Sequence, residues 1–277
     1  MSVMKARFVL PLVAAAATAS ALAASGGAAS GAPDARLQGT FVMNGRVTVA
    51  HNVHGEHTGQ RVTRRWAFNS TCRAGPCRTV ILRRERGSHA SDRITLTRRR
   101  AGVYSGSGVF YQALACNGRR YPHGGRVPFS ITVRVTRAHR VQSTLFATSL
   151  SATYVNRSRR NNTRCSGFLG HDSARYSGRL QGSPPSTPRA QFMYTADGAT
   201  DPLGYSFRDT SARGHGGARI TRRSWNFGDP DSGDNTSTSA TPHHTFSSAA
   251  PHKVRLNVRD ANGLTSGVTK TVPGTSP

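Results

Sequence analysis

The sequence predicts an all-β protein: an antiparallel β-barrel or sandwich of about eight strands, followed by a smaller immunoglobulin-like β-sandwich. Apolar residues alternate with polar ones at a period of two along many segments, and no segment shows a convincing helical period of 3.6 residues. The Ser- and Pro-rich segment 181–189 is typical of a linker between two cores. We therefore expect one domain over residues 35–180 and a second over residues 190–273.

The clearest alternation in the first domain runs from Val127 to Val135, where apolar residues occupy every second position as a half-buried strand requires. The same period predicts further strands at residues 40–53, 62–68, 79–84, 93–98, 103–111, 146–154 and 174–180. Regular spacing and Gly-containing connections favour antiparallel neighbours that form a barrel or a sandwich. About 145 residues are enough to bury a core of their own.

The second domain has its own alternating segments. Trp225 and Phe227 share one face of a strand that ends in a Gly228-Asp229 turn. Asp260-Ala261-Asn262-Gly263 is rich in turn-forming residues and closes a last hairpin. The expected core of this domain consists of Trp225, Phe227, Val254, Leu256 and Val258.

The order of these features resembles the PKD (polycystic kidney disease) repeat family, with further matching elements at 207–211 and 242–246. The resemblance implies an immunoglobulin-like sandwich that serves as an adhesion, spacer or binding module and carries no catalytic residues. Two positions depart from the family. A loop, 230–235, follows the Gly-Asp turn where the family has glycine. His252 replaces the tyrosine near the start of the penultimate strand, so the hydroxyl-mediated corner bond is not expected.

The first 23 residues have the pattern of a secretory signal peptide. Lys5 and Arg7 precede an apolar run over residues 8–19, and Ala21-Leu22-Ala23 fits the small-residue cleavage site. An uncleaved anchor is the alternative, but the run is shorter than the roughly 20 residues that span a bilayer. We expect a secreted protein, extracellular or at the cell surface, with no transmembrane segment after cleavage.

Four cysteines, all within residues 35–180, agree with an oxidising compartment. Cys72 and Cys77 flank a turn-rich insert that can bring their Cα atoms within disulfide reach, which leaves Cys116 to pair with Cys165. A four-cysteine zinc site is the competing interpretation, but Cys116 and Cys165 do not form a second close pair.

Charge is divided unequally between the domains. Residues 35–180 hold 26 arginines, no lysine and four acidic residues, a net charge of +22, whereas residues 181–277 carry +3. A field of that size attracts polyanions. In an exported protein these are anionic envelope polymers or polysaccharides. The alternative is that a coding bias toward arginine supplies the charge without any ligand.

The candidate polyanion-binding residues form three basic runs that we place at strand ends or in loops: Arg83, Arg84, Arg98, Arg99, Arg100, Arg157, Arg159 and Arg160. Single-strand nucleic-acid modules interleave aromatic residues with basic ones to stack bases, and these runs lack that signature. No specific nucleic-acid partner is expected.

The residues do not favour an enzyme. The four acidic residues of the first domain are scattered among arginines, which are expected to depress the carboxyl pKa values and keep the groups ionised. The nucleophile elbow of serine hydrolases is absent from the sequence, and paired cysteines offer no thiolate. No catalytic residues are predicted.

Two segments are candidates for metal binding. His51, His54, Glu56 and His57 are dense in ligands, but alternation along a strand would direct His51 and His54 to opposite faces. Asp229, Asp231 and Asp234 offer carboxylates for calcium on one loop, the alternative being side chains that cap their own turn. No other cofactor is predicted.

The sequence as a whole predicts a secreted, non-enzymatic binding protein of the cell envelope or extracellular space. Its basic domain contacts anionic polymers, and its PKD-like domain serves as an interaction module, with a carbohydrate or protein partner, or as a spacer. One alternative is a small-ligand carrier, since Leu37-Gln38-Gly39-Thr40-Phe41 resembles the opening of lipocalin-like barrels. Another is an accessory binding protein of a secreted polysaccharide- or protein-degrading system.

Overall fold

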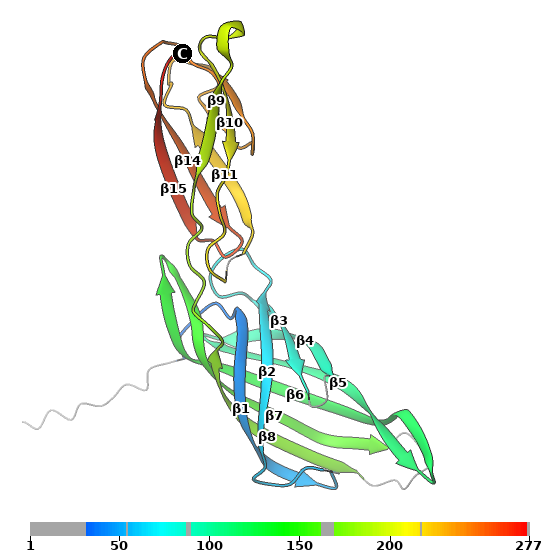
Figure 1. Ribbon diagram of the computed structural model, residues 1–277. Coiled ribbons are helices and arrows are strands. Elements are labelled where there is room, and N and C mark those ends of the chain that lie inside the picture. Colours follow the sequence, from blue (N-terminus) through cyan, green and yellow to red (C-terminus); the bar gives the residue numbers. More distant parts are fainter. Residues whose placement is uncertain (1–31, 54, 87–89, 162–168, 217, 276–277) are drawn as a thin grey trace, which may run out of the picture. The chain divides into compact units, whose positions relative to one another are not determined.

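The computed structural model describes residues 32–53, 55–86, 90–161, 169–216 and 218–275 (Figure 1). The predicted signal peptide, residues 1–23, lies outside this part of the chain. No helix among these residues has the length and apolar character needed to cross a membrane.

A closed antiparallel barrel occupies the first domain, and each strand pairs with its neighbours in chain order until the last one pairs with the first. Its strands are β1 (Gly39–His51), β2 (Arg61–Ser70), β3 (Thr79–Glu85), β4 (Ser91–Arg100), β5 (Val103–Cys116), β6 (Arg119–Val141), β7 (Thr144–Asn161) and β8 (Gly170–Leu180). The all-β prediction is confirmed, and of the two predicted architectures the structure has the barrel. β6 and β7 extend well beyond the predicted segments because charged and glycine-containing ends continue the ladder.

The second domain is a sandwich of two antiparallel sheets. The order is β13-β10-β9 in one sheet and β12-β11-β14-β15 in the other. The strands are β9 (Phe192–Ala196), β10 (Gly204–Asp209), β11 (Ile220–Asn226), β12 (Thr236–Ser237), β13 (His243–Thr245), β14 (His252–Asp260) and β15 (Thr265–Val272), with a short 3-10 turn η1 (Gly198–Thr200) after β9.

Period-two alternation fills one part of the barrel interior with apolar side chains. Phe41, Trp66, Leu82 and Val133 are each fully buried, and they come from four different strands. Phe41 packs edge-on against Phe68 at 5.5 Å between ring centroids. This part of the interior is a solid core rather than a cavity, which follows from the close packing that buried side chains reach.

The core of the second domain is the predicted one. Its five members, Trp225, Phe227, Val254, Leu256 and Val258, are at most 2% exposed. The Trp225 indole Nε1 donates a 2.8 Å hydrogen bond to the Ser239 carbonyl, so its polar atom is satisfied inside the core.

The Gly228 turn and His252 depend on each other. Gly228 has φ +71°, and a Cβ there would lie 2.6 Å from the Lys253 carbonyl oxygen, so only glycine fits. His252 stacks on Phe246 at 4.1 Å and lies with Nδ1 3.3 Å from the Gly228 carbonyl. The imidazole therefore makes ring-stacking and polar contacts at the place where the family has tyrosine.

The Cys72–Cys77 disulfide is present, with its Cα atoms 5.4 Å apart. Arg36, which is buried, donates from Nη2 to the Cys72 carbonyl at 2.8 Å and from Nη1 to the Gly75 carbonyl at 3.2 Å. Cys116 is disulfide-bonded as well, and its predicted partner Cys165 lies outside the described residues. The short loop between Cys72 and Cys77 is thus held by both a covalent bond and an arginine.

Replacing Trp225 by alanine is expected to lower the free energy of unfolding of the second domain by about 3 to 5 kcal/mol, because it leaves a large cavity in the core. Chemical denaturation of the full chain, followed by circular dichroism, measures this. Ser224→Ala, an exposed neighbour on the same strand, is the control and should change stability by about 0.5 kcal/mol or less. An unchanged Trp225→Ala variant would show that this residue is not a core residue.

Replacing Cys72 and Cys77 together by serine is expected to destabilise the barrel by about 2 kcal/mol, as loop-closure entropy predicts for so short a loop. Denaturation under non-reducing conditions measures the loss. Peptide mapping of the wild-type chain should recover the Cys72–Cys77 link and the Cys116–Cys165 link. Recovery of unlinked peptides would contradict the pairing.

Candidate functional site

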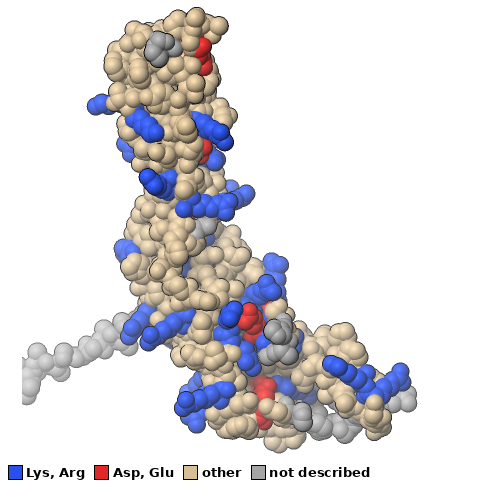
Figure 2. Space-filling view, viewed as in Figure 1, with Lys and Arg blue, Asp and Glu red and all other residues tan. Residues whose placement is uncertain are grey.

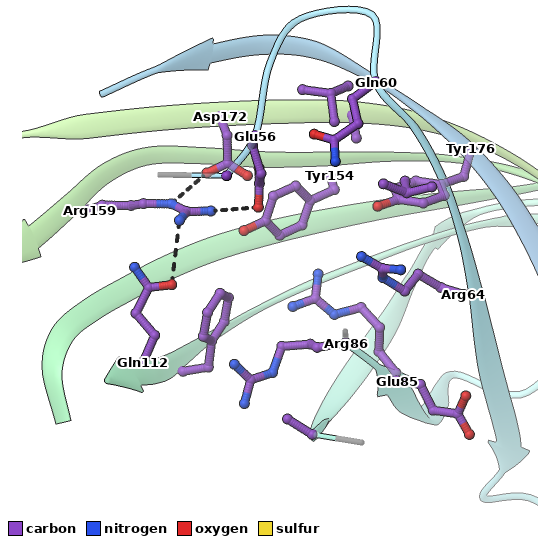
Figure 3. A pocket seen from close by; sticks show the side chains of 17 residues that line it. Glu56, Gln60, Arg64, Glu85, Arg86, Gln112, Tyr154, Arg159, Asp172 and Tyr176 are labelled. Carbon is purple, nitrogen blue, oxygen red and sulfur yellow. Dashed lines mark hydrogen bonds and ion pairs between the residues drawn. The ribbon is translucent and has the colours of Figure 1, made fainter. Parts of the chain in front are cut away.

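A cavity of about 380 Å³ lies inside the barrel at the end where β1 leads into β2 and β3 into β4 (Figure 3). Arginine and aromatic side chains line it: Arg64, Arg84, Arg86, Arg159, Phe110, Tyr154 and Tyr176. We call it the arginine cavity. Its volume falls within the range of small-molecule sites in proteins.

The register of the barrel directs Arg64 and Tyr176 into this cavity. Arg64 lies opposite Met43, a buried interior residue, and two positions before the buried Trp66 on the same strand face. Tyr176 lies opposite Gly45, where any Cβ would collide with the phenol ring at 2.3 Å. Gly45 therefore makes the room that the Tyr176 ring occupies.

Arg84 is 6% exposed and forms an ion pair from Nη2 to Asp92 Oδ2 at 2.6 Å. Its guanidinium lies 4.3 Å from the centroid of Phe129 and 4.9 Å from that of Tyr154. Arg86 shares the same carboxylate, with Nε 3.0 Å from Asp92 Oδ1. Two guanidiniums thus depend on one acidic group, and aromatic faces supply the remaining stabilisation.

Arg159 organises the other side of the cavity. It donates from Nε to Asp172 Oδ1 at 3.0 Å and from Nη2 to Glu56 Oε1 at 3.4 Å, and Nη1 contacts Gln112 Oε1 at 3.5 Å (Figure 3). Burial raises the pKa of Glu56, and the Arg159 charge offsets this only in part. The expectation that arginines would depress the pKa of every barrel carboxyl is therefore wrong for Glu56.

The two tyrosines of the cavity keep their protons at neutral pH. Burial raises the pKa of Tyr154 strongly and raises that of Tyr176. Both phenols can therefore donate a hydrogen bond to an acceptor in the cavity as well as offer a ring face to it.

A second candidate site lies on the outside of the barrel. Arg46 lies directly opposite Arg61 on β2 and opposite Arg175 on β8, so three arginines form a row across three strands. Four residues before Arg46 on β1 lies Val42, and Arg65 and Arg179 lie opposite it on the two neighbouring strands. All five side chains are exposed, and none forms an ion pair with any described carboxylate. We call Arg46, Arg61, Arg65, Arg175 and Arg179 the outer arginine face.

The predicted polyanion-binding arginines are divided between different environments. Arg83, Arg99, Arg100 and Arg157 are exposed. Arg84 lies near the end of β3, as predicted, but strand alternation turns its side chain into the barrel. Arg159 also faces the interior, because a break in the β7–β8 register between Asn156 and Arg159 reverses the alternation there. Arg98 forms an ion pair with Asp34. Arg160 lies in β7, and its side chain is outside the described part of the structure.

The structure does not bring the predicted calcium ligands together. Asp229 is 1% exposed; it accepts hydrogen bonds from the Ser247 backbone N–H at 2.8 Å and from the Ser247 hydroxyl, and His244 Nε2 lies 3.2 Å away. Asp231 is exposed, and Asp234 Oδ1 accepts from Ser232 at 3.0 Å. The Asp229 oxygens are engaged in holding the loop together.

The histidine segment of the barrel also does not converge. His51 stacks on His171 at 4.9 Å, whereas Glu56 turns into the arginine cavity toward Arg159. His57 is exposed, and His54 lies outside the described residues. No metal cluster forms from the described members of this segment.

Asp197, Asp201 and His243 in the second domain do bring three potential ligand atoms within 4.8 Å of one another. His243 Nε2 lies 2.6 Å from Asp197 Oδ2, and Thr245 Oγ1 donates to Asp201 Oδ2 at 2.7 Å. These groups satisfy one another. Sequence reasoning missed this cluster because His243 is far from both aspartates along the chain and no local pattern links them.

Replacing Asp229 by asparagine is expected to lower the free energy of unfolding by about 1.5 to 3 kcal/mol at neutral pH. Burial by itself would raise the pKa of Asp229, but hydrogen bonds from Ser247 and His244 outweigh it and lower the pKa. Its ionisation therefore stabilises the fold above the ordinary aspartate pKa, and this contribution is lost as the pH falls through the lower folded-state pKa.

Denaturation of wild type and Asp229→Asn at pH 7, 5 and 3 tests this, with the exposed Asp231→Asn as control. The gap between wild type and Asp229→Asn should narrow with acidification, and Asp231→Asn should show little effect. A gap that stays constant down to about pH 2 would contradict the assignment.

Comparison with known proteins identifies the second domain. Residues 186–274 match the family model described as PKD domain, so the chain carries a C-terminal PKD domain. Two solved structures are similar to it. The PKD1 domain of Vibrio anguillarum Epp has 23% identity, covers 34% of this chain and 100% of its own, and gives a TM-score of 0.29. The PKD1 domain of the Vibrio cholerae metalloprotease PrtV has 24% identity, covers 32% of this chain and 99% of its own, and gives a TM-score of 0.27. No curated protein matches the chain.

Proposed function

We propose that the protein is a secreted, non-enzymatic binding protein of the extracellular space or cell surface. Its barrel contacts an anionic polymer of the envelope, such as an acidic polysaccharide, through the outer arginine face. The PKD domain serves as an interaction module or spacer. The sequence pattern of the first 23 residues and the disulfide support export, since disulfides persist in oxidising compartments.

The observation that carries this proposal is the row Arg61–Arg46–Arg175 across β2, β1 and β8. Residues directly opposite each other in an antiparallel pair have Cβ atoms about 5 Å apart, and like charges in that position destabilise the sheet. No described carboxylate relieves the repulsion by forming an ion pair with these arginines. A ligand with repeated negative charges would do so.

The surroundings of the outer arginine face fit a polymer better than a small molecule. Its exposed neighbours on the same strands include Thr48 and Ser177, whose hydroxyls can hydrogen-bond to sugar hydroxyls or anionic groups. On the side of the barrel visible in Figure 2, basic side chains outnumber acidic ones. The face is convex and exposed, as suits an extended chain that lies across the strands.

The chemistry of the barrel carboxylates supports a binding role rather than catalysis. Asp172 and Glu56 both contact Arg159, and Asp92 pairs with two arginines. Each of these carboxylates is engaged in holding a guanidinium. A paired-carboxylate mechanism would need one of them to deliver its proton to a substrate.

We expect the full chain without its leader to bind polygalacturonate or dextran sulfate and not neutral dextran. If all five arginines contact the polymer, affinity should fall by about two orders of magnitude between about 50 and 200 mM salt, by analogy with polyphosphate binding. The double variant Arg46→Gln/Arg175→Gln should weaken binding. It should also make the slope of log affinity against log salt concentration shallower, by the amount that corresponds to about two fewer neutralised charges.

The matched control is Arg134→Gln/Arg140→Gln, which removes the same charge from exposed positions on β6. Equal weakening by both double variants would mean that only net charge attracts the polymer and would contradict a binding face on β2, β1 and β8. If the affinity does not change with salt concentration, the arginines do not carry polymer binding, and the PKD domain does. The control should keep wild-type stability to within about 0.5 kcal/mol, as is usual for exposed substitutions. Arg46→Gln/Arg175→Gln should be at least as stable as wild type, because it relieves the repulsion within the row.

A further inference from the structure

The arginine cavity holds more positive charge than its carboxylates neutralise. Four guanidiniums face it, those of Arg64, Arg84, Arg86 and Arg159. Asp92 serves two of them and Asp172 and Glu56 serve Arg159, which leaves Arg64 with no carboxylate partner among the described residues. The remaining lining carboxylate, Glu85, is exposed, and Figure 3 shows it turned away from the cavity.

Arg64 is the unsatisfied member of this group. Its one hydrogen bond is from Nη1 to the carbonyl of its own neighbour Thr63 at 3.0 Å, so most of its donors have no partner in the described structure. It is half-buried on the interior face of β2. A half-buried guanidinium without a counter-ion is costly, and an anion bound in the cavity would remove that cost.

Arg84 places a second positive charge in the cavity wall. Its Nη2 pairs with Asp92, and its Nε is buried without a hydrogen-bond partner among the described residues. Contact with Phe129 and Tyr154 holds the guanidinium in one plane. The position of this charge is therefore set before any ligand arrives, which reduces the entropy that binding must overcome.

The other residues that line the cavity indicate which further chemical groups the ligand has. Phe110, Tyr154 and Tyr176 offer ring faces, and Val62 and Ala174 add apolar surface. On the opposite side from Arg64, Glu56 and Asp172 can accept hydrogen bonds from hydroxyl groups. A volume of about 380 Å³ suits a molecule with a single ring rather than a polymer segment.

We propose that the arginine cavity is a binding site for a small hydroxylated carboxylate, held at its anionic end by Arg64 and Arg84 and enclosed by the aromatic walls. This site is separate from the outer arginine face. A sugar acid and an aromatic hydroxy acid both have this chemistry. Sugar rings with axial C–H groups and aromatic rings both pack on tyrosine and phenylalanine faces.

Isothermal titration of the full chain without its leader, with glucuronate and with 4-hydroxybenzoate, tests the proposal and separates the two sources. Glucose and 4-hydroxybenzyl alcohol are the neutral counterparts. We expect one of the acids to bind at least tenfold more tightly than its neutral counterpart. Arg64→Gln should weaken that binding at least tenfold, and Arg64→Lys should give an intermediate affinity, because lysine keeps the charge but loses the planar fork.

Arg65→Gln is the matched control, since Arg65 is the next residue on β2 and its exposed side chain belongs to the outer arginine face. It should leave the affinity for the small acid unchanged and weaken polymer binding, whereas Arg64→Gln should do the reverse. If Arg64→Gln loses small-acid binding but keeps polymer binding, the two sites are separate. Equal effects of the two variants on the small acid would overturn the proposal.

A measurement on the wild-type chain keeps the test valid if Arg64→Gln does not fold. The chain has two tryptophans. Trp66 lies 5.1 Å from the ring of Tyr176, which lines the cavity, and Trp225 is in the PKD domain. Addition of the acid should shift the Trp66 indole N–H resonance and leave that of Trp225 in place. Failure of both acids to shift the Trp66 resonance, or equal shifts at both tryptophans, would also overturn the proposal.

Discussion

Strand alternation in the closed barrel decides which side chains of neighbouring arginines reach the interior and which stay in solvent, and a register break between Asn156 and Arg159 on β7 turns Arg159 inward as well. Neighbouring residues on one strand face opposite sides, so Arg64 enters the interior and Arg65 stays in solvent. Arg83 and Arg84 divide in the same way on β3. Closure fixes this partition, because β8 pairs with β1 and leaves no edge at which the register could slip.

The interior arginines determine where the barrel core ends. Trp66 and Leu82 are fully buried. Arg64 lies two residues before Trp66 on β2, and Arg84 lies two residues after Leu82 on β3. Burying a guanidinium requires carboxylates and aromatic faces nearby, and Asp92, Asp172 and Tyr154 supply them. Those groups cannot pack as densely as aliphatic side chains, and a cavity is left where the ion pairs begin.

Much of the fold could be predicted because it depends on local period and turn residues. Each predicted strand of the first domain coincides with an observed one, and Trp225 and Phe227 lie in the core as their alternation required. The arginine cavity could not be predicted, because it depends on which strands meet. Arg64 already stood in the inward register with Trp66 and Phe68. Pairing of β2 with β3 brings it near Arg84, and closure through β1 and β8 brings it near Tyr176.

The contacts of the candidate calcium ligands were hidden from the sequence for a similar reason. Three aspartates within six residues suggest a common ligand, but a sequence does not show which side chain points into the core. His244 stacks on Phe227 at 4.2 Å and thereby stands beside Asp229. The partner that orients this carboxylate thus comes from β13, a strand that follows it in the chain and pairs in the other sheet.

The contacts of the interior arginines explain why lysine could not replace them. Arg84 lies flat against Phe129 and Tyr154 while it pairs with Asp92, and Arg159 reaches Asp172, Glu56 and Gln112 at once. A lysine ammonium has neither the planar face nor the spread of donors for these arrangements. A coding bias toward arginine would explain the exposed positions as well as a ligand does, but it does not explain the interior ones, where the geometry itself demands a guanidinium.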